Sequence, residues 1–126
     1  MTAMSDYLEN ELLDHALGTG AFTAPSGTYV QLHTGVPGET GANNVSAETT
    51  RQAATWAAAS GGVAQLSADL TWSNWSAGPE TITHISIWDA ASAGNCLFTG
   101  ALSASKAIVN TDDLVLDATN TSITFD

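Results

Sequence analysis

The stretch TITHISIWD, residues Thr81–Asp89, is nine residues long and is dominated by Ile and Thr, with a Trp near its end. β-Branched and aromatic residues favour strands, and the stretch lacks the glycine and proline that would interrupt a hydrogen-bonded ladder. It is the strongest strand signal in the chain. We therefore expect a β-rich fold in which this segment is the principal strand.

Shorter strand signals flank this segment at intervals of about ten residues, separated by Gly, Asn, Asp and Ser. They are Tyr29–His33, Arg51–Ala58, Val63–Leu66, Leu70–Trp72, Cys96–Leu102, Ala107–Asn110, Leu114–Leu116 and Ser122–Phe125. Many short strands at such spacing are typical of antiparallel sandwiches, so the sequence predicts a mainly β domain with a β-sandwich or jelly-roll-like architecture. A parallel α/β sheet would need a helix between successive strands, and the sequence predicts only one helix.

That single helix is predicted near the N-terminus, over residues 5–17. Its apolar residues recur at three- and four-residue steps, as on one face of a helix. Ser5 or Asp6 can cap its N-terminus, and Gly18 is placed to end it. We expect a short amphipathic helix that covers an open end or edge of the sheets.

Composition predicts one globular domain spanning residues 1–126. Hydrophobic residues make up 44% of the chain and charged residues only 12%, which argues against disorder. Thirteen acidic residues face two basic ones, so the formal net charge is -11. Such a surface repels phosphate groups, and we expect neither nucleic acid nor membranes as partners. A neutral or basic protein surface is the better candidate.

The chain begins without the charged and apolar regions of a signal peptide, and no window approaches the ~20 apolar residues of a membrane span. We therefore expect folding in a cytoplasm. Cys96 is the only cysteine, so no disulfide can form within the chain. Its apolar neighbours predict a buried, unreactive thiol.

Candidate catalytic chemistry is sparse. The three histidines have no His or Cys partner at ligand spacing, so we expect His33 and His84 to be packed or hydrogen-bonded residues and not zinc ligands. Serine is abundant, but the Gly-x-Ser-x-Gly elbow is missing. Asp112 and Asp113 are adjacent and are expected to be solvated turn residues. The sequence therefore predicts no enzyme activity, no catalytic residue, no cofactor and no metal site.

Two further features concern binding surfaces. The segment Gly35–Gly41 is rich in glycine but lacks the Lys-Ser/Thr ending of a phosphate-binding loop, so we expect a long mobile connection. Trp56, Trp72 and Trp88 lie in strand patterns and are expected in the core. Trp75 lies between Asn and Ser and is expected near the surface, as an interface anchor or a platform for a sugar.

Several segments, in order along nearly the whole chain, resemble a family of small virion proteins of tailed phages. These segments are Asp6–His15, Tyr29–Thr34, Pro37–Glu39, Arg51–Ala53, Thr83–Ala90, Leu97–Leu102 and Lys106. Members of that family are often labelled tail-fibre proteins, and capsid decoration proteins are similar in size and type. The chain departs from the usual family pattern after Gly41, at Asn43–Glu48. The family has no catalytic motif, so the resemblance implies no active-site residue.

The resemblance implies a virion structural protein made in the cytoplasm of a host bacterium. Our leading hypothesis is a capsid decoration, or cement, protein that binds across capsid subunits as a homo-oligomer, with a trimer favoured. The alternative is a tail-fibre or tail-tip component that binds other tail proteins or a host glycan. The candidate contact residues are Tyr7, Leu8, Leu12, Val36, Pro37 and Trp75.

A third hypothesis, from a different class, is a carbohydrate-active enzyme or lectin-like module. It would require paired carboxylates in a cleft near Trp75, with Asp69, Glu80 and Asp89 as the candidates. Separate locations for these three side chains would argue against it.

Overall fold

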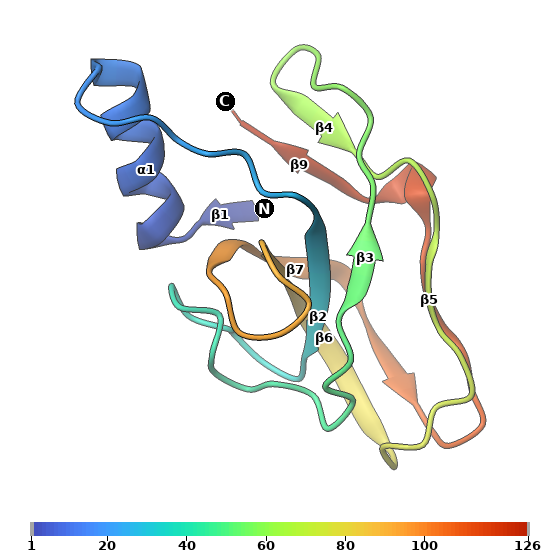
Figure 1. Ribbon diagram of the computed structural model, residues 1–126. Helices are drawn as coiled ribbons and strands as arrows, with labels where there is room; N and C mark the ends of the chain where they lie inside the picture. Colours follow the sequence, from blue (N-terminus) through green and yellow to red (C-terminus); the bar gives the residue numbers. More distant parts are fainter. Residues whose placement is uncertain (1, 126) are drawn as a thin grey trace.

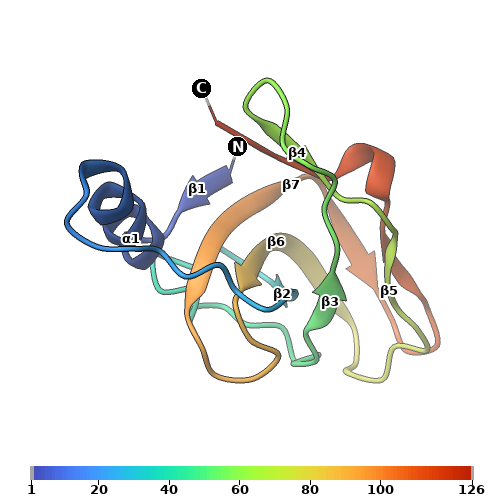
Figure 2. The same cartoon turned by 45° about the horizontal axis from the view of Figure 1, so that its top comes forward.

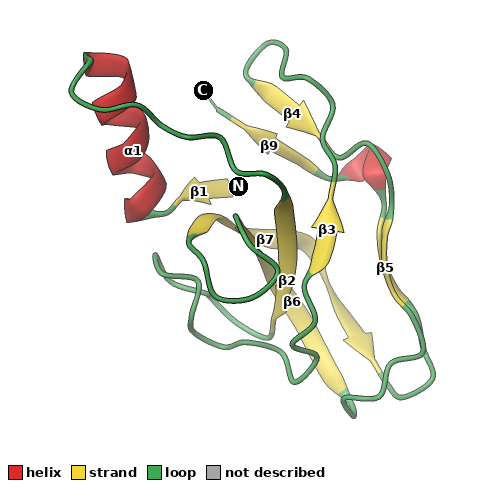
Figure 3. Ribbon diagram, viewed as in Figure 1, coloured by secondary structure: helices red, strands yellow, loops and turns green. Residues whose placement is uncertain are grey.

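The computed structural model describes residues 2–125 (Figure 1). Along the chain these residues form β1 Thr2–Met4, α1 Asp6–Leu17, β2 Thr28–His33, β3 Gln52–Ala54, β4 Val63–Gln65, β5 Leu70–Trp72, β6 Glu80–Trp88, β7 Cys96–Ile108, β8 Leu114–Leu116, the short 3-10 helix η1 Ala118–Asn120 and β9 Ser122–Thr124. All strand pairs are antiparallel. The predicted mainly β, antiparallel fold with one N-terminal helix is confirmed (Figure 3).

The main sheet has five strands in the order β1-β7-β6-β2-β3. Residues 81–88 of the predicted principal strand lie in β6, between β7 and β2. Apolar side chains on these strands face the second layer of the fold, and Val30, Leu32 and Ile82 have no exposed surface. Strand β6 is paired on both sides, and its Ile82 and Ile87 are buried in the core while His84 and Ser86 carry its polar groups.

The second layer is a long two-stranded ribbon that runs across this sheet (Figure 2). In it β4 pairs with β9 and β5 pairs with β8. The Leu66 amide donates to the Thr121 carbonyl between these two ladders, so the ribbon is one structure interrupted by η1. An isolated bridge between Trp56 and Leu66 joins the ribbon to the chain after β3. The arrangement is sandwich-like, with the core between the sheet and the ribbon.

Strand β7 differs most from the sequence prediction, which divided it at Leu102. It is continuous from Cys96 to Ile108. The partner of Ile82 is Lys106 and the partner of His84 is Ala101, so residues 102–105 form a bulge opposite Thr83, a single residue of β6. Small and polar residues in this bulge resemble a loop in sequence, although the strand resumes after it.

The helix is attached to the sheet through its N-terminal cap. Ser5 accepts a hydrogen bond from the Leu8 amide (3.2 Å) and is itself bound to β7, because its amide donates to the Leu97 carbonyl and its hydroxyl to the Cys96 carbonyl. Gly18 ends the helix in the left-handed conformation, with a φ of 75°. Figure 1 shows α1 at the outside of the fold, with its first turn beside β1.

The tryptophans follow the prediction in part. Trp72 and Trp88 are buried, and Trp56 is half-buried against the core. The expected exposure of Trp75 is wrong: only 2% of it is exposed, and its indole donates to the Gly78 carbonyl (2.8 Å). Asn74 has a φ of 53°, and this turn leaves Asn74 at the surface while Trp75 lies in the core.

Candidate functional site

Helix α1 exposes most of its apolar residues. Leu8 is its only buried residue, whereas Leu12 is half-buried and 58% of Leu13 and 75% of Leu17 are exposed. Residues four apart lie on the same side of a helix, so Leu13 and Leu17 form a continuous apolar strip. We call Leu12, Leu13, Ala16 and Leu17 the helix patch. A helix of 12 residues usually depends on tertiary packing for its stability, and this one leaves its second half uncovered.

The candidate contact residues predicted from the sequence have different environments. Leu8, Pro37 and Trp75 are buried inside the domain and offer almost no surface to a partner. Tyr7, Leu12 and Val36 keep exposed surface. Leu13 and Leu17 were missed as contact residues, although both belong to the apolar set that predicted the helix. The sequence could have indicated them, because these apolar residues cover a wider part of the helix circumference than a helix needs to pack on one sheet.

The glycine-rich segment Gly35–Gly41, which we expected to be a long mobile connection, is a loop with backbone hydrogen bonds. The Gly41 amide donates to the Gly38 carbonyl and the Asn43 amide to the Pro37 carbonyl. Pro37 is fully buried, and Val36 projects from the same loop with 64% of its surface exposed. Val36 is therefore the one side chain of the predicted contact loop with a large apolar surface.

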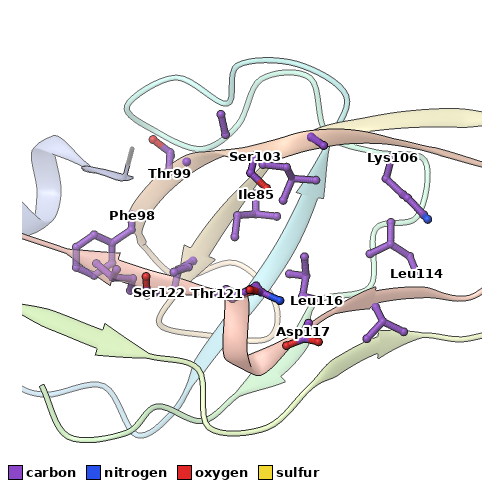
Figure 4. A pocket seen from close by; sticks show the side chains of 18 of the residues that line it. Ile85, Phe98, Thr99, Ser103, Lys106, Leu114, Leu116, Asp117, Thr121 and Ser122 are labelled. Atoms are coloured by element: carbon purple, nitrogen blue, oxygen red, sulfur yellow. The ribbon is translucent and has the colours of Figure 1, made fainter.

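A groove of about 540 Å³ separates β7 from the outer side of the ribbon (Figure 4). One wall is formed by residues 98–104 and Lys106, and the other by residues 113–117 and 120–123. Half-buried apolar residues that pack against the core, among them Ile85 and Leu102, form its floor. Figure 4 shows Ser103 and Lys106 on the β7 side and Leu114, Leu116 and Asp117 on the ribbon side.

A second hollow of about 280 Å³ continues this apolar surface toward the C-terminus. It shares Trp56, Phe98 and Ile123 with the groove and adds Phe125. The rings of Phe98 and Phe125 lie 5.7 Å apart between centroids. Apolar side chains therefore extend without a break from the groove to the end of β9.

On the opposite face of the main sheet, buried polar groups are linked in a series of hydrogen bonds. The His33 Nδ1 donates to the Asn43 carbonyl (2.8 Å), and the Ser86 hydroxyl donates to His33 Nε2 (2.7 Å). The Trp88 indole completes the series by donating to the Ser86 oxygen (2.7 Å). Because a carbonyl only accepts, Nδ1 carries a proton, and in the neutral imidazole Nε2 is then the acceptor for the Ser86 hydroxyl. Burial lowers the pKa of His33 below its usual 6.5, which keeps the ring neutral.

Arg51, one of the two basic residues of the sequence, lies beside this series of hydrogen bonds. Arg51 lies over the Trp88 ring, with its guanidinium carbon 3.8 Å from the ring centroid. Its Nη1 donates to the carbonyls of Ala90 and Ala93 in the turn between β6 and β7. These contacts occupy Arg51, whereas Lys106 is exposed at the rim of the groove.

The three carboxylates of the carbohydrate-active hypothesis each bind a different part of the backbone. Glu80 accepts from Ser46 and the Ala47 amide, Asp89 accepts from the Asn95 amide, and Asp69 accepts from the Ala118 amide. With Trp75 buried, they do not form the expected cleft around it. Within residues 2–125, no group of three or more His, Cys, Asp or Glu side chains is placed to hold a metal ion.

Cys96 is buried, and burial raises the pKa of its thiol to about 11, as expected for an unreactive group. Asp112 and Asp113 are exposed turn residues that accept from the amides of Val109 and Asn74. The one α-helix of the described chain is too short to cross a membrane.

An antiparallel sandwich-like fold with apolar surface on a projecting helix and in an edge groove is suited to contacts between proteins. Residues 3–124 match the model of a family described as podophage GP4 fiber I protein gp80. The chain belongs to this family, and the resemblance to virion structural proteins of tailed phages is confirmed. It is a fibre-type structural protein of the virion that contacts other virion proteins. No curated protein matches the chain.

Proposed function

We propose that this protein is a component of a phage tail fibre and that the helix patch attaches it to a neighbouring virion protein. The observation that carries this proposal is the exposure of Leu13 and Leu17 on a helix that buries only Leu8. The family description, a fibre protein, favours the fibre over the capsid shell as the location.

Leucine surface exposed to water is unfavourable, and Leu13 and Leu17 are both mostly exposed. Burial of one leucine side chain contributes about 1.5–3 kcal/mol, so Leu13 and Leu17 together offer several kcal/mol to a partner. The exposed part of Leu12 belongs to the same patch and would enlarge the contact. Around the helix the surface is acidic, with Asp6, Glu9 and Asp14 on α1, so a partner with neutral or basic groups beside its apolar surface is complementary.

The test is incorporation of the protein into particles. In phages that carry Leu13→Ser together with Leu17→Ser, we expect the purified virions to lack this chain while the soluble chain still folds. Val109→Ser is the matched control, because Val109 is an exposed apolar residue outside both α1 and the groove. Normal incorporation of the double variant, measured on a quantified gel, would contradict the proposed attachment.

The same gel separates the fibre from the decoration role predicted first from the sequence. A fibre component is present in a few copies per particle, whereas a decoration protein follows the number of capsid subunits. Decoration stays a prediction, as does the homotrimer, and a copy number close to that of the major capsid protein would favour it.

A further inference from the structure

Strand β7 has one side that is only partly paired. Strand β6 pairs along one side of β7, while β1 covers only Phe98–Gly100 on the other side. Within residues 2–125, no strand pairs with the outer side of residues 101–107. Residues 102–105 form the bulge of β7, so the regular part of this edge is Ala101 with Lys106 and Ala107, and its backbone groups are available to a further strand.

The opposite wall of the groove has a second free edge. Strand β8 pairs only with β5, and β9 pairs only with β4, in the part of the chain that the structure describes. The outer sides of β8 and β9 therefore line the groove without a backbone partner of their own. Two unpaired strand edges thus border the same hollow (Figure 4).

The floor between the edges is apolar and incompletely covered. Of the partly buried hydrophobic residues that pack against the core, most lie here: Trp56, Ile85, Phe98, Leu102 and Ile123. An extended segment in the groove would cover these side chains with every second residue, since alternate side chains of a strand point to the same face. The core of the domain would then be closed on this side.

The charges of the groove walls and of the whole protein indicate whether that segment comes from a second copy of this protein or from a different protein. Asp113 and Asp117 lie in the ribbon wall, against the single cation Lys106 in the β7 wall. A second copy of this chain would bring a further net charge of -11 to the contact, whereas a neutral or basic segment would be attracted. The complementary occupant is therefore a segment of a different protein.

We propose that the groove binds an extended segment of another virion protein, which adds a strand to the free edge of β7 and places alternate apolar side chains on the groove floor. This mode of recognition takes affinity from main-chain hydrogen bonds and specificity from the side-chain pockets. The inference rests on the proposed function only in that the partner belongs to the virion.

Photo-crosslinking in assembled particles tests the proposal. Ser103 on β7 and Ser122 on β9 are exposed and lie on opposite walls of the groove, and each is replaced in turn by benzoylphenylalanine. We expect both positions to crosslink to the same short segment of one other virion protein. Ser92, in the turn between β6 and β7, is the matched control and should not reach that segment.

Crosslinks from the two walls to unrelated segments, crosslinks only to a second copy of this chain, or no crosslinks would each overturn the proposal. If the modified chains do not enter particles, hydrogen exchange of the unmodified chain gives the same decision. Amides of residues 101–107 should exchange roughly tenfold or more slowly in virions than in the free chain. Equal exchange rates would refute the inserted strand.

The outcome is independent of the helix patch. Failure of the Leu13 and Leu17 variants to block incorporation would refute attachment through α1, while crosslinks from both groove walls would still support the inserted strand. Loss of incorporation in the Leu13 and Leu17 variants, without any crosslink from the groove, would support attachment through α1 and refute the inserted strand.

Discussion

The two faces of the β6–β7 hairpin differ in how completely their groups are satisfied. Around Trp88, the imidazole of His33, the hydroxyl of Ser86 and the guanidinium of Arg51 all have partners inside the molecule. Around the groove and on α1, apolar side chains such as Leu17 and Phe98 remain exposed or half-covered. We call the first the pinned region and the second, the groove with the helix patch, the open region.

The pinned region contains groups that stabilise the fold, whereas the open region contains surface that can bind other proteins. Removal of a group from the pinned region leaves a buried partner unsatisfied or a close contact strained, and such changes lower the free energy of unfolding. Removal of an exposed side chain of the open region, such as Leu17, takes away surface that water already reaches. We therefore expect stability to depend on the pinned region and assembly on the open region.

The largest effect is expected from Gly41→Ala. Gly41 has a φ of +68°, and an added Cβ would lie 2.7 Å from the Cys96 sulfur and 2.9 Å from the Trp88 ring. We expect the free energy of unfolding to fall by roughly 3 kcal/mol in chemical denaturation, from backbone strain and a steric clash together.

Gly18→Ala is the control for the strain alone. Gly18 has a φ of +75° with no atom within 4 Å of its added Cβ, so about 1 kcal/mol is expected. Equal losses in the two variants would mean that the packing against Cys96 and Trp88 contributes nothing.

A smaller effect is expected from Arg51→Lys. The ammonium of lysine keeps the charge but cannot reproduce the planar guanidinium, which stacks on Trp88 while it donates to the carbonyls of Ala90 and Ala93. We expect a loss of roughly 1–2 kcal/mol in the same denaturation experiment. Lys106→Gln changes an exposed cation and should leave stability unchanged, and an equal loss there would point to net charge as the cause.

The dependence of stability on pH should report the buried His33. Its pKa is lowered in the folded state, so the unfolded chain binds a proton more readily as the pH falls below about 6.5. This contribution to stability is complete above pH 6.5 and is lost as the pH falls through the folded-state pKa.

Denaturation midpoints from pH 8 to pH 5 measure this loss, with His33→Gln as the comparison because it removes the titrating group. The difference in stability between native protein and variant should shrink as the pH falls. A constant difference would show that His33 does not titrate in this range.

Local patterns were sufficient to predict much of the fold. The bounds of β5 and β8 agree with the predicted Leu70–Trp72 and Leu114–Leu116, because alternating apolar residues between turn residues define a strand without further context. Ser5 and Gly18 limit α1 as predicted, since caps act within one helical turn.

Non-local contacts account for the rest. The inward position of Trp75 depends on the turn at Asn74 and on the pairing of its amide with the Asp112 carbonyl, far away in sequence. The groove depends on which strand edges remain unpaired after the sheet has formed, and no local pattern around β7 contains that information. The burial of Leu8 likewise reflects where the cap of α1 is attached.

The smallest effect on stability is expected in the open region, and α1 provides the comparison within one helix. Leu17→Ala removes a side chain that is mostly exposed, so the free energy of unfolding should change by no more than about 0.5 kcal/mol. Leu8→Ala removes the buried anchor of the same helix and should cost roughly 3 kcal/mol. If Leu17→Ala proved as costly as Leu8→Ala in the isolated protein, the helix patch would be packed within the free chain in solution. Its exposed leucines could then not be the surface that attaches the protein to the virion.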